Sequence, residues 1–194
     1  MASLPPLLID LPRNPLVAVG IPVGLGIGTG LLTRNGTYGP NSLWYKSLNK
    51  PRFDPPKWAF GVVWPTLYAA MGWSSHLLVK ALDRTPSGLG RQRALRSLSL
   101  YYIQLALNQS WTPLNFGFGS LGFALLDITA LTSTIFVWLD TARHVDERVL
   151  WLNLPYAIWS TYATYLNGSL WWQNGGAKVV QDLVGRVMGK SKGQ

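Results

Sequence analysis

Long runs of apolar and aromatic residues alternate with short clusters of cations along this chain of 194 residues. The three longest runs without any Lys, Arg, Asp or Glu are residues 58–79, 97–126 and 149–177, which contain 22, 30 and 29 residues. A helix needs about 20 mainly apolar residues to cross the hydrocarbon core of a bilayer. The runs also lack the strict alternation of membrane β-barrel strands. The pattern therefore predicts an all-α, polytopic membrane protein.

We expect a bundle of five transmembrane helices that forms a single domain over residues 1–194. The spans are placed at residues 16–32, 58–82, 97–113, 121–141 and 149–172. Beyond them, residues 175–194 combine an apolar helical stripe with cations, which predicts a basic amphipathic helix on the membrane surface or a flexible tail. Gly20, Gly24 and Gly28 in the first span fit either close packing inside the bundle or the interface of a homodimer.

Composition excludes several classes of site. The chain has no Cys, so it has no disulfide framework, Cys-ligated zinc site or thiol nucleophile. His76 and His144 lie far apart in the sequence, and we expect no metal site. The net charge of +9 is spread in clusters between neutral runs, which argues against nucleic acid as a partner. The cations divide eight to nine between the two sides of the predicted bundle, so they predict no membrane orientation.

Polar and aromatic residues share helical faces in the predicted spans. These faces comprise Trp64, Tyr68 and Met71; Tyr101, Gln104, Asn108 and Trp111; and Tyr156, Trp159, Ala163 and Leu166. Together they predict a cavity with aromatic walls and few polar groups, which is typical of ligand pockets. The alternative is core packing plus an aromatic belt at the membrane interfaces. The belt accounts for Trp44, Trp138, Trp151, Trp171 and Trp172. The mid-span Trp64 and Trp159 leave only core packing as an alternative.

Two charged features have open interpretations. Asp127 is the one acid well inside a span. It is either a proton or ligand site, or, as we favour, a structural residue bonded to Asn108, Gln104 or an indole N–H. Four cations precede the second span: Lys46, Lys50, Arg52 and Lys57. They predict, with equal weight, an anion site at the helix N-terminus or an anchor to anionic lipid.

Several motifs occur in the order and spacing of one known family. They are Trp44-Tyr45, Lys50-Pro51, PPKW at 55–58, VWPTLYAAMG at 63–72, QLALN at 104–108 with Trp111, ALLD at 124–127, PYAIW at 155–159 and YLN at 165–167. Over residues 44–174 the chain resembles the translocator protein family, also called the tryptophan-rich sensory protein or peripheral benzodiazepine receptor family.

The resemblance implies a five-helix bundle, often dimeric, that binds porphyrins, sterols and benzodiazepine-site ligands in a cavity covered by the first loop. By motif position, the ligand-contacting residues are Tyr45, Pro55, Trp64, Tyr68, Asn108, Trp111, Trp159 and Ala163. In some bacterial members, the tryptophans matching Trp64 and Trp159 are associated with light-dependent porphyrin breakdown, and they are catalytic here only if that reaction occurs. The Tyr and Arg of the animal cholesterol motif are replaced by Gly168 and Trp172, which favours porphyrin over cholesterol.

The leading hypothesis is a membrane receptor or carrier for porphyrins such as protoporphyrin IX and haem, with sterols or benzodiazepine-site ligands as further guests. The porphyrin is a ligand and no cofactor is expected. The alternatives are a light- and oxygen-dependent porphyrin-degrading enzyme and a scaffold that binds lipid or a protein partner. Expected partners are a hydrophobic small molecule, membrane lipid and a second copy of the chain. The resemblance implies the mitochondrial outer membrane in a eukaryote and the outer membrane in a bacterium.

Overall fold

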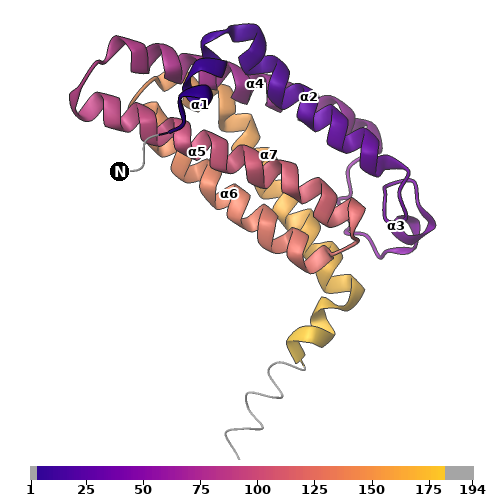
Figure 1. The fold of residues 1–194 in the computed structure, drawn as a ribbon. Coiled ribbons are helices and arrows are strands. Elements are labelled where there is room, and N and C mark those ends of the chain that lie inside the picture. The colour runs from indigo at the N-terminus through magenta and orange to yellow at the C-terminus, as the bar shows by residue number, and fades with distance from the viewer. Residues whose placement is uncertain (1–3, 182–194) are drawn as a thin grey trace, which may run out of the picture.

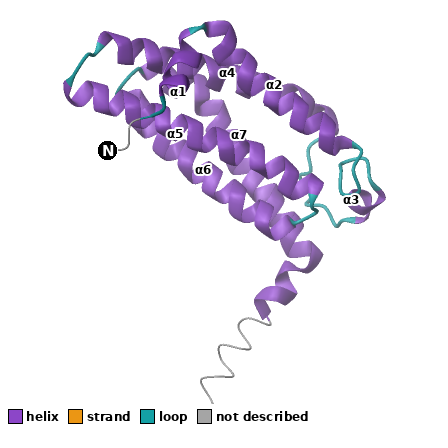
Figure 2. Ribbon diagram, in the orientation of Figure 1, coloured by secondary structure: helices purple, strands orange, loops and turns teal. Residues whose placement is uncertain are grey.

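The computed structural model describes residues 4–181 and contains seven α-helices and no β-strand in that range. Five helices are long and lie side by side as a bundle (Figures 1 and 2). They are α2 (Pro15–Arg34), α4 (Lys57–Arg84), α5 (Gly88–Thr112), α6 (Leu121–Arg143) and α7 (Glu147–Trp171). Two short helices accompany them, α1 (Pro6–Asp10) and α3 (Leu43–Ser47).

The ends of the five long helices lie within two residues of the predicted span boundaries, with one exception. The third span was expected to start at residue 97, but α5 already starts at Gly88. The extra turns carry Arg91, Arg93 and Arg96. Arg is a good helix former, so a helix continues past the end of its apolar run. The short helices α1 and α3 were not predicted, and the predicted tail lies largely outside the described residues.

Two of the helices are long and apolar enough, by length and composition, to cross a membrane: α2 and α6. The other three long helices carry most of the buried polar side chains, which lie in the interior of the bundle. Helix α6 packs against α5 and α7, while α2 packs against α4, which also contacts α5 and α7. The structure is thus an all-helical bundle that turns polar groups inward and leaves apolar side chains exposed on its outside.

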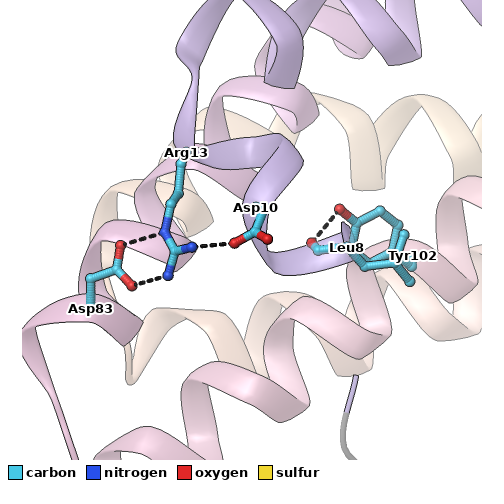
Figure 3. A network of polar contacts seen from close by, with 5 residues as sticks. All are labelled: Leu8, Asp10, Arg13, Asp83 and Tyr102. Carbon is cyan, nitrogen blue, oxygen red and sulfur yellow. Dashed lines mark hydrogen bonds and ion pairs between the residues drawn. The ribbon is translucent and has the colours of Figure 1, made fainter. Parts of the chain in front are cut away.

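Polar contacts join the N-terminal segment to α4 and α5 (Figure 3). Arg13 reaches Asp83 near the end of α4 with two hydrogen bonds, Nη2 to Oδ1 at 2.8 Å and Nε to Oδ2 at 3.1 Å, and it also pairs with Asp10. The hydroxyl of Tyr102 donates to the carbonyl oxygen of Leu8 at 2.6 Å. These contacts hold α1 against α4 and α5.

Gly20, Gly24 and Gly28 of α2 do not pack closely inside the bundle, although such packing was one of the two interpretations of this stripe. A Cβ added at Gly20, Gly24 or Gly28 would meet nothing within 4 Å, so this stripe is not a close contact inside the bundle. Close approach occurs instead at Gly26, where a Cβ would lie 2.1 Å from the ring of Tyr68, and at Gly72, where it would lie 2.4 Å from the carbonyl oxygen of Ala18. The contact between α2 and α4 therefore depends on Gly26 and Gly72.

Trp138 also differs from its prediction. Its side chain is fully buried, so it belongs to the core and not to an interfacial belt. It packs against Tyr101, with ring centroids 6.0 Å apart. Trp151 and Trp172 remain exposed, at 63% and 52%, as the belt interpretation requires.

Candidate ligand-binding site

A cavity of about 660 Å³ opens among the five long helices beside the loop that carries α3. Pockets for small ligands occupy about 300–1,000 Å³ and have mainly apolar and aromatic walls. Helix α2 ends at this side of the bundle and α4 begins there, so the loop that joins them, residues 35–56, lies at the opening. In Figure 1 this loop covers one end of the bundle, opposite the N-terminal segment.

The structure places seven of the eight predicted ligand-contacting residues on the cavity wall: Tyr45, Pro55, Trp64, Tyr68, Asn108, Trp111 and Ala163. They come from α3, the loop, α4, α5 and α7. Trp159 is not part of the wall. Its ring lies behind two wall residues, 6.5 Å from the ring of Trp64 and 5.8 Å from that of Phe60. For all eight residues, contact with a ligand stays a prediction.

Two wall residues, Tyr68 and Asn108, begin a chain of buried hydrogen bonds that continues to Tyr156 and Gln104, which do not line the cavity. The Tyr68 hydroxyl donates to Oδ1 of Asn108 at 2.5 Å, and Nδ2 of Asn108 donates to the hydroxyl of Tyr156 at 2.8 Å. Tyr156 in turn donates to Oε1 of Gln104 at 2.7 Å. Each of the four polar residues is hydrogen-bonded to the next one in the chain, so they stabilise each other inside the bundle. The predicted polar face of α5 is therefore structural as well as a cavity wall.

Aromatic rings continue the wall on the α4 side. Trp64 lies 5.9 Å from Tyr68 and 6.4 Å from Tyr156 between ring centroids. These distances and their tilted or edge-on angles are within the range in which aromatic pairs attract. The ring positions are consequently fixed by neighbours, and Trp64 presents a rigid surface to the cavity.

Two buried polar atoms of wall residues have no partner in residues 4–181. They are the indole nitrogen Nε1 of Trp111 and the amide oxygen Oδ1 of Asn167, both buried. The amide nitrogen of Asn167 donates to Oδ1 of Asn115 at 3.2 Å, so only its oxygen is unpaired. An unpaired buried polar group costs free energy. A guest that supplies a donor and an acceptor would recover it.

Two cations lie on the wall near the loop. Lys50 sits 4.5 Å above the ring of Tyr45 and 3.6 Å from the carboxylate of Asp54. Arg34, at the end of α2, has no ion pair within the described residues. Burial and the negative charge of Asp54 raise the pKa of Tyr45 to about 12, so its hydroxyl stays protonated at neutral pH. The cavity thus has a cationic rim and a neutral, aromatic interior.

The loop is fastened by hydrogen bonds at two places, to α7 and to the π-helical turn Trp172–Gly176 that follows it. Tyr162 donates to the carbonyl oxygen of Phe53 at 2.5 Å. Asn174 accepts from the backbone nitrogen of Asn49 and donates to its carbonyl oxygen, both at 2.9 Å. These bonds define the position of the loop over the cavity, as the resemblance implied.

Asp127 lies outside the cavity wall. Its Oδ1 accepts a hydrogen bond from the hydroxyl of Ser110 at 2.7 Å, which is a different partner from the three expected. Its Oδ2 is buried without a partner in the described residues. No group of three His, Cys, Asp or Glu side chains in residues 4–181 is arranged to hold a metal ion.

Sequence reasoning missed Arg34, Asn115 and Asn167. Asn115 lies in a π-helical turn, Pro113–Gly117, where the helical spacing used to find faces no longer applies. Asn167 follows Ala163 by one turn on the predicted face of α7. That spacing is the signal that points to it. Arg34 follows a run of 20 residues without a charge and lies at the mouth only because α2 ends there.

A sequence model of the TspO/MBR family matches residues 18–173. The chain is 38% identical to the translocator protein of Homo sapiens over 139 residues, which cover 72% of this chain and 79% of that protein. It is 38% identical to the translocator protein of Bos taurus over 158 residues, covering 81% and 89%. It is 37% identical to the tryptophan-rich sensory protein of Cereibacter sphaeroides over 130 residues, covering 64% and 72%.

Proposed function

Because the chain belongs to the TspO/MBR family of membrane proteins, we propose that it is a membrane receptor or carrier that binds porphyrins in the cavity among its helices. In this proposal, all five long helices cross the membrane. The observation that carries it is the aromatic cavity of about 660 Å³ with cations at one end. A porphyrin is a flat aromatic ring with carboxylates on one edge, and its shape and charge match that division.

The ring of the porphyrin would lie against Trp64 and Tyr68, and its propionates would meet Arg34 and Lys50. Charge-assisted hydrogen bonds are the stronger polar contacts, and the planar guanidinium of Arg34 can bind a carboxylate through two nitrogens. Arg34 has no ion pair to break within the described residues. Lys50 would exchange its contact with Asp54 for one with the ligand.

The names of the relatives fit a protein that binds a small molecule and either transports it or signals its presence. The mammalian relatives are called translocator proteins, and the bacterial one is called a sensory protein. Both names are consistent with a protein that recognises a small molecule within a membrane. Sterols and benzodiazepine-site ligands are further candidates for the same cavity, and their lack of carboxylates leaves the cationic rim without a partner.

The test is a titration of the purified, detergent-solubilised protein with protoporphyrin IX in the dark, followed by tryptophan quenching corrected for inner-filter absorption. Saturation near one porphyrin per chain is expected. Ala163→Leu, which fills the cavity, should weaken binding at least tenfold. Ala130→Leu is the matched control, because Ala130 is exposed on α6 away from the wall. Linear quenching without saturation, or equal effects of both variants, would contradict the proposal.

The enzyme and scaffold alternatives are separated by two further measurements. In light and oxygen, consumption of more than one porphyrin per chain would identify an enzyme. Loss of that turnover in Trp64→Phe with Trp159→Phe, at unchanged dark affinity, would assign it to these indoles. A scaffold function would persist in Ala163→Leu.

We also propose that the exposed glycines of α2 mediate a homodimer, since Gly20, Gly24 and Gly28 leave room for a second helix. The expected location is the mitochondrial outer membrane in a eukaryote or the outer membrane in a bacterium. Crosslinking in membranes, compared between the native chain and Gly24→Leu, tests the dimer. An equal crosslinked fraction in both would refute this interface.

A further inference from the structure

A second cleft lies at the other end of the bundle, far from the aromatic cavity. It has a volume of about 450 Å³ and lies between the last turns of α4 and the turn that joins α6 to α7. Trp64 on the cavity wall and Lys80 in this cleft are 16 residues apart on one helix, which corresponds to roughly 24 Å. The two sites are therefore separate.

The cleft carries an excess of positive charge. Its wall holds three cations, Lys80, Arg84 and Arg148, and one anion, Asp146, which gives a net charge of +2. Arg148 is already paired with Asp146, with Nη2 2.7 Å from Oδ2 and Nε 3.0 Å from Oδ1. This contact lowers the pKa of Asp146, so its carboxylate is ionised at neutral pH.

Of the three cations of the cleft, Lys80 and Arg84 have no ion pair within 4 Å among the described residues, although the charge of Arg84 also contributes to the lowered pKa of Asp146. They are four positions apart on α4, so their side chains occupy the same face of the helix. Two like charges at this spacing repel each other. An anion placed between them removes the repulsion and gains two charge-assisted hydrogen bonds.

The surroundings of the cations indicate the chemical class of that anion. Trp73 lies on the same cleft about 10 Å deeper along α4 and is 44% exposed, as is typical of indoles at the level of lipid headgroups. Leu77 and Val145 line the cleft as well. The cleft therefore offers cations at the water side and an apolar surface and an indole towards the membrane, which is the division of a phospholipid.

We propose that this cleft binds the phosphate of an anionic phospholipid, which Lys80 and Arg84 contact directly. Arg84 is suited to two phosphate oxygens at once, whereas Lys80 binds as a point charge. Asp146 faces the same cleft and opposes the anion. The site depends on membrane residence and not on the porphyrin function proposed above.

The experiment is native mass spectrometry of the detergent-solubilised full chain with phosphatidylglycerol or with phosphatidylcholine of identical acyl chains. The native protein is expected to retain one phosphatidylglycerol in preference to phosphatidylcholine. Lys80→Gln with Arg84→Gln should reduce that preference by roughly 30-fold, since each cation near an anionic headgroup contributes about fivefold. Both side chains are exposed, so the variant keeps the fold.

A second variant is expected to raise the preference for phosphatidylglycerol, which a general loss of lipid affinity could not do. Asp146→Asn removes the opposing charge and should raise the preference about fivefold. Asp146 caps α7 by accepting from the backbone nitrogen of Arg148 at 3.0 Å, and Asn is an equally good cap, so helix α7 is preserved.

The matched control is Arg93→Gln with Arg96→Gln, which removes the same charge from exposed positions of α5 outside the cleft. Equal losses in the control and in the cleft variant would overturn the proposal, as would no preference in the native protein. A further arm adds inorganic phosphate in a volatile buffer at constant ionic strength. Displacement of the lipid by millimolar phosphate would overturn the assignment to lipid and point to a soluble phosphate.

Discussion

Replacing Tyr156 by Phe tests whether the buried hydrogen-bond chain stabilises the bundle. Tyr156 is fully buried, and its hydroxyl both accepts from Asn108 and donates to Gln104. Phe keeps the ring and leaves one donor and one acceptor unpaired inside the protein. Each unpaired buried group costs about 1–3 kcal/mol, so two of them should lower the free energy of unfolding by about 2–6 kcal/mol.

The assay is thermal unfolding in detergent. A loss of 1 kcal/mol lowers the Tm of a protein of this size by roughly 2–4 °C, so Tyr156→Phe should lower it by roughly 4–24 °C. Tyr165→Phe is the matched control. It is the same chemical change at a side chain that is 47% exposed and makes no hydrogen bond within the described residues, and the Tm should stay within about 2 °C.

A second substitution tests the cause. Gln104→Met removes the acceptor that Tyr156→Phe leaves unpaired. Replacing both partners of a buried hydrogen bond by apolar groups is nearly neutral. The double variant should therefore be less destabilised than the sum of the two single variants. Additive effects, or an unchanged Tm in Tyr156→Phe, would refute the assignment of the network as a coupled unit.

Three further predictions concern the rim, the helix contact and the loop. Arg34→Gln should weaken protoporphyrin IX binding about fivefold to tenfold and leave its dimethyl ester unaffected, by quenching titration, while the exposed Arg52→Gln should change neither. Gly26→Ala should lower the Tm by several degrees because its Cβ would overlap the ring of Tyr68, whereas Gly24→Ala meets open space and should not. The pKa of Tyr45 is raised from 10.0 to about 12, so the stability it contributes is complete below pH 10 and is lost as pH rises towards 12. The native Tm should then fall more over this interval than that of Tyr45→Phe, and parallel pH curves would contradict it.

The long helices were predictable because the absence of charge over a membrane length is a strong physical constraint. Their ends were less so. At the start of α5, Arg96 marks where the uncharged run stops, but the backbone is helical from Gly88 onward. The short helix α3 is set by a local cap, with the Ser42 side chain accepting from the backbone nitrogen of Tyr45 at 3.0 Å. Such local signals are too common in sequences to predict a five-residue helix.

The cavity was predictable where one helix supplies neighbouring wall residues, as α4 does with Trp64 and Tyr68. The wall was not predictable where a residue's position depends on how neighbouring helices pack against each other. Helical spacing puts Trp159 on the face of Ala163, yet its indole lies behind Trp64 and Phe60. Ser110, the partner of Asp127, lies on the neighbouring α5, and only the register between α5 and α6 brings the two together.

The distribution of polar groups separates what stabilises the bundle from what is free to select a ligand. Gln104, Asn108 and Tyr156 are hydrogen-bonded to one another, so few of their donors and acceptors are available to a ligand. Affinity must then come mainly from apolar contact with rigid rings, which many flat molecules can make. Selection falls to the groups without partners in the described residues, above all Arg34 at the rim and the amide oxygen of Asn167. Removing the charge of Arg34 should therefore change which guests bind more than it changes how tightly an uncharged guest binds.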